Sequence, residues 1–411
     1  MRATIVIPSY WSRMSTLPFD KDDVVYDHPT PLDMSGTLER ALESIKILKN
    51  RDFNVVVLAC ATARDIQPMV QEKVENMVLG FKDHFPIAVV SHAFEGRMRE
   101  RLGESDAAAA GADPDVISLT GYSNIRNMCL VVTELLRSEV AVLFDDDEVY
   151  EDPEYLDKIF ENVGTERDGR FVGALAGYYQ RPDGSYLLPP PEEWYMSEWP
   201  MIRSMNEAFR IIGEEPRLKP TPWVFGGNMI IHRDVYRKIS FDPHVRRGED
   251  IDFLTNCKFF DIDFLLDREL AIKHLPPKTH VPAWALFREN IYRFVYAREK
   301  LRRQVPVEGL RHVDVRELDP YPGSCMRDDL EDLIFRTCTL MGFFYLSQRA
   351  DARPVELGFQ ETMNNVHIAR YVAPPEHDPF LWYLEFREKW EKTMGFLSGD
   401  EVLAREMAER L

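Results

Sequence analysis

The sequence has no long apolar run and few cysteines, and these two absences narrow the kind of protein it encodes. No stretch approaches the roughly 18 consecutive apolar residues of a membrane span. The opening residues, Met-Arg-Ala-Thr-Ile-Val-Ile-Pro, lack the apolar core of a signal peptide. The five cysteines are scattered without a Cys-x-x-Cys pair, which argues against a zinc knuckle and a disulfide framework. We therefore expect a cytoplasmic protein in a reducing compartment.

Positive charge is also scarce in this sequence. Lysine and arginine number 50 against 69 aspartates and glutamates, so the formal net charge is −19. Broad contact with nucleic acid or with an anionic membrane requires a positive field, so both partners are disfavoured. A local basic pocket is compatible with this total, and the candidates for one are segments 274–278 and 292–298.

The remaining composition is that of a globular protein. Hydrophobic residues make up 45% of the sequence and charged residues 29%, which are ordinary proportions. A chain of 411 residues is long enough to bury a substantial core, as one large domain or as two smaller ones.

Short apolar runs alternate with helical patterns through residues 1–150. The strand-like runs are 3–8, 54–59, 87–90 and 140–144, and the helical patterns are 36–48, 66–81 and 124–136. Continuous apolar strands separated by helices predict parallel strands that are buried on both faces. We interpret this region as a doubly wound α/β half. The polar segment 97–112 interrupts the pattern and fits either a flexible lid or a plain surface helix.

The rhythm changes after residue 150, and a third pattern begins near residue 285. Residues 151–284 mix strand and helix signals, with a helix start at Asp152-Pro153 and a hairpin turn at Asp183-Gly184. The other elements expected there are strands at 171–177 and 223–232 and a helix at 250–260. Residues 285–411 are mainly helical, with patterns at 283–301, 328–346, 356–370 and 380–394. We expect the first two regions to be halves of one domain, followed by a helical C-terminal region.

An acidic turn, Asp145-Asp146-Asp147, directly follows the apolar run at 140–144. In open α/β sheets the ligand site lies at the carboxyl ends of the strands. Three adjacent carboxylates repel one another unless a cation neutralises them, and hard oxygen ligands suit Mg²⁺ or Mn²⁺. A solvated turn that caps the next helix is the alternative, but Asp152 already provides a cap for that helix. The turn therefore predicts a divalent metal site.

Five motifs together resemble the GT-A glycosyltransferases, particularly those similar to family 2. The motifs are Ile-Val-Ile-Pro-Ser-Tyr at 5–10, Ser-Asn-Ile-Arg-Asn at 123–127, the acidic turn, Phe-Gly-Gly-Asn at 225–228 and Arg-Gly-Glu-Asp at 247–250. The resemblance implies a Rossmann-like, mixed and mainly parallel sheet flanked by helices. It also implies a soluble, metal-dependent hexosyltransferase that moves a sugar from a UDP- or GDP-sugar to a small-molecule or glycan acceptor.

The same resemblance assigns roles to individual residues. Around the nucleotide-sugar it places Pro8, Ser9, Tyr10, Ala59, Asn124, Arg126, Asp145, Asp146, Gly227 and Asn228. Asp147 is the expected metal ligand, and His274 is expected to complete the metal site. If transfer inverts the anomeric centre, Asp250 is the expected general base beside Glu249.

Each of these motifs also has a plain structural explanation. Asn124 can cap a helix, the glycines at 226–227 can serve a β-bulge, and Glu249 and Asp250 can complement a helix dipole. A histidine on an apolar strand is usually structural, which applies to His274. Asp252 is a second candidate for the base.

Three other functions remain open at this point. A nucleotidyltransferase that forms nucleotide-sugars would usually carry a Gly-x-Gly-x-Arg loop after the first strand, where this chain has Pro-Ser-Tyr-Trp. A retaining enzyme that glycosylates a glycerate-type small molecule shares the acidic motif and the late histidine. A non-catalytic nucleotide-sugar-binding protein would share the fold. The amphipathic C-terminal helices can pack on the core or on a second subunit, so a homo-oligomer is compatible with the sequence.

Overall fold

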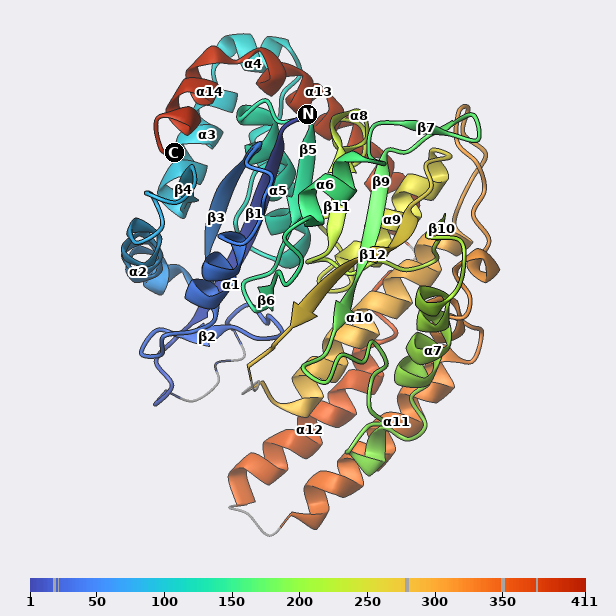
Figure 1. The fold of residues 1–411 in the computed structure, drawn as a ribbon. Coiled ribbons are helices and arrows are strands. Elements are labelled where there is room, and N and C mark those ends of the chain that lie inside the picture. The colour runs from blue at the N-terminus through green and yellow to red at the C-terminus, as the bar shows by residue number, and fades with distance from the viewer. Residues whose placement is uncertain (18–19, 21, 278–280, 349–351, 375) are drawn as a thin grey trace.

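The computed structural model describes residues 1–17, 20, 22–277, 281–348, 352–374 and 376–411. Its centre is a ten-stranded sheet whose main path runs β10-β12-β9-β11-β5-β1-β3-β4, with β2 beside β1 and β6 beside β12 (Figure 1). The strands of this sheet are β1 (Ala3–Ser12), β2 (Thr30–Pro31), β3 (Phe53–Ala61), β4 (Ile87–Val90), β5 (Val140–Leu143), β6 (Glu148–Val149), β9 (Ala174–Gln180), β10 (Leu218–Pro220), β11 (Met229–His232) and β12 (Leu265–His274). A separate small sheet pairs β7 (Glu166–Arg167) with β8 (Arg170–Phe171).

The strands of the first half are parallel and buried on both faces. β1 pairs with β3 and β5, and β3 pairs with β4, all in parallel register. Their side chains alternate between two cores, as period-2 strands require. Ile5 and Ile7 of β1 belong to the core under helices α1 (Leu38–Ile45) and α2 (Gln67–Leu79). Val6 belongs to the core under α5 (Tyr122–Leu135).

The second half extends the same sheet with strands of mixed direction. β11 runs antiparallel to both β5 and β9, and β12 runs parallel to β9 but antiparallel to β10 and β6. The predicted fold class, a mixed and mainly parallel sheet flanked by helices with a helical C-terminal region, is confirmed. The antiparallel pairing of β6 with β12 has a functional consequence, because it places His274 opposite Glu148, next to the acidic turn.

Helices cover both faces of the sheet and then build the C-terminal region. The helices of the α/β part are α1 (Leu38–Ile45), α2 (Gln67–Leu79), α3 (His92–Leu102), α4 (Ser105–Ala109), α5 (Tyr122–Leu135), α6 (Tyr155–Phe160), α7 (Met201–Ala208), α8 (Arg233–Tyr236) and α9 (Glu249–Phe259). Those of the C-terminal region are α10 (Ala283–Arg302), α11 (Leu330–Ser347), α12 (Ala352–Ile368), α13 (Pro379–Gly399) and α14 (Glu401–Ala408).

The C-terminal helices do not form a detached unit. α11 and α12 pack together at one end of the molecule, whereas α13 and α14 return to the N-terminal half beside α3 and α4 (Figure 1). Arg97 of α3 pairs with Glu406 of α14 at 3.0 Å, and the Trp390 indole of α13 donates to the Tyr236 carbonyl at 2.9 Å. The C-terminal helices α13 and α14 therefore pack against the half of the domain that we predict to bind the nucleotide.

Several local predictions need correction. The turn at Asp183-Gly184 exists, but 185–188 is not a strand, so no hairpin forms. The strand expected at 223–232 is confined to β11, because the preceding segment turns at Gly226-Gly227. Segment 97–112 is helical, in α3 and α4, and the buried Arg101 of α3 pairs with Asp106 and Asp400. The surface-helix alternative was therefore the better interpretation of that segment.

Two further features belong to the described part of the chain. No helix there is long and apolar enough to cross a membrane. All five cysteines are buried and free.

Candidate active site

A cavity of about 210 Å³ opens at the carboxyl ends of β1 and β5 and brings together segments from the whole length of the α/β part. Its lining consists of Tyr10, Asp27, His28, Tyr122, Arg126, Asp145, Asp146, Asp147, Tyr179, Phe225, Gly226, Arg247, Gly248, Glu249, Asp250, His274 and Arg293. The position agrees with the rule that ligands of open α/β sheets bind beyond the carboxyl ends of the strands. The acidic turn, Arg126, Glu249, Asp250 and His274 thus meet in one place.

Asp145 is neutralised by an arginine from α5. Arg126 Nη1 and Nη2 donate to the two carboxylate oxygens of Asp145 at 2.7 and 3.0 Å, and Arg126 Nε donates to Glu249 at 3.1 Å. Arg126 and Glu249 are both buried, so this bidentate arrangement is shielded from water and strong. The guanidinium links the acidic turn to the start of α9. Each of its three nitrogens already donates a hydrogen bond to a carboxylate of the protein.

Asp146 turns toward β1. Its carboxyl accepts a hydrogen bond from Ser9 Oγ at 2.7 Å, and Ser9 Oγ in turn accepts from the Trp11 indole at 2.9 Å. Burial raises the pKa of Asp146 well above its usual range, and the neighbouring charge of Asp147 acts in the same direction. The buried Ser9 therefore shapes the turn from below and does not line the cavity itself.

Asp147 and His274 form the third environment of the turn. His274 Nε2 lies 3.4 Å from Asp147 Oδ2, and the Leu275 amide donates to the Asp147 carbonyl at 2.9 Å, which fixes the end of β12 against the turn. Burial opposes the charged form of His274, but the hydrogen bond and charge of Asp147 outweigh it and raise the His274 pKa. For Asp147 burial is likewise outweighed by His274, which lowers the Asp147 pKa.

The donor chemistry of this pair fits a divalent metal ion. Within the described part of the chain, no three His, Cys, Asp or Glu side chains form a cluster that could hold one. A carboxylate and an imidazole together suit Mn²⁺, and ions of this kind usually take one or two protein ligands and complete their coordination with substrate phosphates and water. Asp147 and His274 are the residues that would hold it.

Glu249 and Asp250 begin α9 and line the same cavity. The helix is preceded by Gly248 in the left-handed conformation (φ 74°), and Asp250 Oδ1 accepts from the Ile251 amide at 2.7 Å. Burial, followed by the charge of Asp250, raises the pKa of Glu249 to about 7. Burial also raises the Asp250 pKa. The adjacent carboxyls therefore disfavour full ionisation at neutral pH.

Four charged or titratable residues of the cavity received no role from the sequence. Arg247 Nη2 pairs with Asp27 Oδ2 at 3.0 Å, and the buried His28 Nδ1 has no hydrogen-bond partner among the described residues. Arg293 reaches the cavity from α10. The basic segment 292–298 did signal Arg293, and the Arg-Gly-Glu-Asp motif contained Arg247, but nothing in the sequence singled out Asp27 or His28. In the other basic segment, 274–278, Lys278 lies outside the described residues.

Six residues that we predicted to lie around the nucleotide-sugar are outside the cavity lining: Pro8, Ser9, Ala59, Asn124, Gly227 and Asn228. The buried Asn228 accepts from Tyr155 Oη and donates to the carbonyls of Tyr178 and Leu270 at 3.2 and 3.1 Å, so its amide joins β9 to β12. Asn124 donates to Thr120, the carbonyl four residues earlier. Asn124 does not cap α5, because the N-cap position is Gly121 and no side-chain cap bond is present there.

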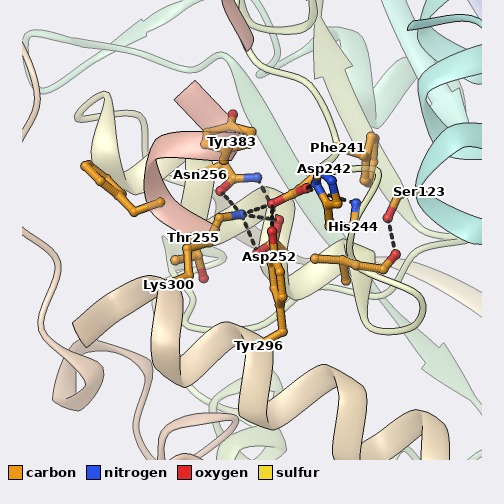
Figure 2. A network of polar contacts seen from close by, with 12 residues as sticks. Ser123, Phe241, Asp242, His244, Asp252, Thr255, Asn256, Tyr296, Lys300 and Tyr383 are labelled. Atoms are coloured by element: carbon orange, nitrogen blue, oxygen red, sulfur yellow. Dashed lines mark hydrogen bonds and ion pairs between the residues drawn. The ribbon is translucent and has the colours of Figure 1, made fainter. Parts of the chain in front are cut away.

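Asp252, the second candidate for the base, belongs to a buried ion cluster away from this cavity (Figure 2). Its carboxylate accepts from Lys300 Nζ at 2.9 and 3.0 Å and from Asn256 Nδ2 at 2.8 Å, and Lys300 also pairs with Asp242 at 2.7 Å. Asp250, two residues earlier on α9, faces the cavity instead.

No protein-family model matches this sequence, and no curated protein sequence matches it. Several solved structures are similar to this chain. The chain is similar over 98% of its length to 86% of a mannosyltransferase, PcManGT from Pyrobaculum calidifontis in complex with GDP-Man and Mn²⁺, at 13% identity and a TM-score of 0.44.

Two further solved structures are similar over a smaller part of this chain. A mycobacterial protein matches 72% of each chain at 14% identity and a TM-score of 0.38. GalNAc-T7 with UDP, GalNAc and Mn²⁺ matches 77% of this chain and 53% of its own, at 11% identity and 0.38. At such identities and TM-scores these structures carry no argument about this chain, so the function proposed below rests on the side chains of the cavity.

Proposed function

We propose that the protein is a divalent-metal-dependent glycosyltransferase that moves a hexosyl group from a UDP- or GDP-sugar to a hydroxyl acceptor. The observation that carries this proposal is that two kinds of reactive group line a single cavity. A carboxylate–imidazole pair, Asp147 and His274, and a carboxylate without a cationic partner among the described residues, Asp250, line the same cavity. Glycosyl transfer needs a group that holds a metal ion at the diphosphate of the sugar donor, and a base that takes the proton from the acceptor hydroxyl.

The residues at the donor side account for how an acidic cavity accepts a diphosphate. Arg126 neutralises Asp145, and the raised pKa of Asp146 favours its neutral form. Asp147 and His274 would hold Mn²⁺ or Mg²⁺, which, when bound, supplies Lewis-acid stabilisation of the charge that develops on the leaving diphosphate. Tyr10 contributes an apolar and aromatic wall to the same cavity.

Asp250 suits the role of general base. α9 holds it rigidly through its contact with the Ile251 amide, and its raised pKa brings its proton affinity closer to that of a base working near neutral pH. In the proposed step the acceptor hydroxyl transfers its proton to Asp250, its oxygen bonds to the anomeric carbon, and the bond from that carbon to the diphosphate oxygen breaks. This single displacement inverts the anomeric centre. If the product instead retains the configuration of the donor, Asp250 is not the base.

A donor panel tests the proposal. The protein is incubated with UDP-glucose, UDP-N-acetylglucosamine and GDP-mannose, with and without Mn²⁺, and nucleoside diphosphate release is measured. A transferase will show slow, Mn²⁺-dependent hydrolysis of one donor in the absence of acceptor. Consumption of pyrophosphate with sugar phosphate formation would identify a nucleotidyltransferase, and binding without turnover would identify a non-catalytic protein.

Two variants assign the roles within the site. Asp147→Ala should abolish Mn²⁺-dependent binding of the nucleoside diphosphate, measured by calorimetry, whereas Asp328→Ala, at a side chain that is 98% exposed, should not change it. Asp250→Asn should leave that binding unchanged and slow transfer by about 10²–10⁴-fold, the usual contribution of a general base. Unchanged Mn²⁺-dependent binding in the Asp147 variant would refute the metal site, and unchanged turnover in the Asp250 variant would remove Asp250 from the mechanism.

A further inference from the structure

The three arginines that line the cavity differ in their partners. Arg126 is bound by Asp145 and Glu249, and Arg247 is bound by Asp27. Arg293 forms no hydrogen bond and no ion pair with any residue in the described part of the chain. It is therefore the cationic group of the cavity whose hydrogen-bond donors are all available to a ligand.

Arg293 is nevertheless held in a defined position. Its guanidinium carbon lies 5.0 Å from the centre of the Phe294 ring and 5.5 Å from that of Tyr321, within reach of cation–π attraction. On the other side it passes over Gly248, where a Cβ atom would come within 2.1 Å of Arg293 Nε. Only a glycine leaves room for the guanidinium at this point, so the start of α9 and the arginine fit together.

Arg293 lies beside the start of α9: its side chain passes over Gly248, two residues before Asp250, and both Arg293 and Asp250 line the cavity. Arg293 and Asp250 are not in ion-pair contact. Arg247 is engaged elsewhere, by Asp27, the residue before His28. Asp250 and Arg293 are thus two neighbouring charged groups, each without an ionic partner among the described residues.

Arg293 and Asp250 are partly buried. A partly desolvated charge without an internal partner favours a ligand of opposite sign. A planar guanidinium in a fixed position matches a carboxylate or a phosphate, which it can bind through two hydrogen bonds. A neutral acceptor would leave the guanidinium unsatisfied.

We infer that the acceptor carries an anionic group, a carboxylate or a phosphate ester, which binds Arg293 and thereby directs a hydroxyl of the same molecule to Asp250. The inference rests on the proposed transferase function and specifies the substrate class of that site. Arg293 acts here as a binding and specificity residue, and takes no part in proton transfer.

Matched small molecules test this inference by calorimetry. Glucose 6-phosphate and glucuronate are each titrated against glucose as the neutral reference, with Mn²⁺ and the nucleoside diphosphate present, so that the phosphate and carboxylate arms are separate. We expect at least one anionic probe to bind wild-type protein about tenfold or more tightly than glucose, since hydrogen bonds between charged groups are about twice as strong as neutral ones. Equal affinity for all three molecules would overturn the inference.

Variants at Arg293 and at its neighbour Arg246 give the second part of the test. Arg293→Met should remove the preference for the anion, and Arg293→Lys should keep part of it, because lysine preserves the charge without the planar fork. Arg246→Met is the matched control, because Arg246 is half exposed, pairs with Glu289 and does not line the cavity. Retention of the preference in Arg293→Met would refute the assignment, as would a loss of nucleoside diphosphate affinity in that variant, since Arg293 would then serve the donor.

The same titrations separate the two proposals. If wild-type protein binds nucleoside diphosphate with Mn²⁺ but does not discriminate between the probes, the anionic acceptor is wrong and the transferase function stands. If it binds an anionic probe through Arg293 but no nucleoside diphosphate, the anion site stands and the transferase function fails. The melting temperature of each variant, compared with wild type, shows whether Arg293→Met is folded; if it is not, Arg293→Lys carries the test.

Discussion

Replacing Lys300 with methionine should destabilise the protein strongly, because Lys300 is the cation of a buried cluster. Its ammonium group is 1% exposed and contacts two buried carboxylates, Asp242 at 2.7 Å and Asp252 at 2.9 Å, as well as the Asn256 side-chain oxygen at 3.1 Å (Figure 2). It also lies 4.3 Å from the centre of the Tyr383 ring of α13. Methionine has a similar length but leaves both carboxylates without their cation.

The magnitude follows from the burial of all three charged groups. Removing one partner from a buried ion pair costs about 3–5 kcal/mol, since the remaining charge stays away from water. None of the three side chains is more than 3% exposed, so screening by solvent does not reduce this figure. A lysine in an exposed pair gives the contrast: Lys389→Met, at a side chain 57% exposed and paired with Asp113, should cost only about 0–1 kcal/mol.

The effect of pH on the Lys300 variant has a definite sign. In wild-type protein Lys300 keeps the Asp242 pKa low despite burial, so Asp242 stabilises the fold above its unfolded pKa of about 3.9 and loses that contribution as the pH falls. Burial raises the Asp252 pKa to about 6, so its contribution is present at low pH and is lost as the pH rises through 6. Without Lys300 both pKa values rise, and both acids then disfavour the fold at high pH. The stability difference from wild type should therefore be largest at pH 8 and smaller at pH 5.

Urea unfolding measures this difference, with the fluorescence of the seven tryptophans as the signal. The comparison uses wild type, Lys300→Met and Lys389→Met at pH 8 and pH 5. Two results would refute the reasoning: a free energy of unfolding within about 1 kcal/mol of wild type at pH 8, the value expected of an exposed pair, or a difference that grows on acidification.

Three further predictions concern the cavity. Glu249→Gln removes the negative neighbour of Asp250, so the apparent pKa of the acidic limb of the pH–rate profile should fall; an unchanged profile would show that the two carboxyls titrate independently. Gly248→Ala introduces a Cβ into the space of the Arg293 side chain and into a left-handed backbone position, so it should weaken binding of the anionic probe and destabilise the fold by about 1 kcal/mol. If Arg293 can move aside freely, binding of the probe will be unchanged and only the backbone cost will remain. Treatment with EDTA should weaken nucleoside diphosphate binding in wild type but have no further effect in Asp147→Asn, and a second loss in that variant would place the metal elsewhere.

The sheet of the first half was predictable because its signal is local. Each parallel strand is a continuous apolar run, and the predicted ranges at 87–90 and 140–144 match β4 and β5 to within one residue. Burial on both faces favours apolar residues at most of these positions, so composition marks the strands. The helix start predicted at Asp152-Pro153 is two residues early, because α6 begins at Tyr155 with Glu154 at its N-cap position.

The second half was less predictable because its strands owe their existence to tertiary pairing. The apolar character of 223–228 does not reflect a strand: Trp223 is buried and donates its indole N–H to the Ala208 carbonyl, and the chain then turns at Gly226-Gly227. The turn at Asp183-Gly184 has typical hairpin residues, but nothing pairs with β9 on the far side of it. The local sequence predicts the turn, but it does not show whether a second strand pairs with β9.

The charges of the cavity show which part of a site a sequence can reveal. Motif order identified the carboxylates and His274, because they sit at strand and helix ends that local patterns define. It could not reveal that Arg126 is already occupied by Asp145 and Glu249, or that Arg293, 167 positions further along, is not occupied. Pairing depends on which side chains the fold brings within 4 Å, and that is a property of the tertiary structure.

The buried ion cluster and the cavity take residues from the same two helices. α9 carries both Asp250 and Asp252, and α10 carries both Arg293 and Lys300. The ion pair between Asp252 and Lys300 therefore fixes the two helices in register, and this register sets the position of Arg293 relative to Asp250. A cluster with no contact to substrate thus determines whether one molecule can meet both groups at once. For this reason the Lys300 variant should lose discrimination between glucose 6-phosphate and glucose under conditions in which it is still folded, whereas the Lys389 variant should retain it.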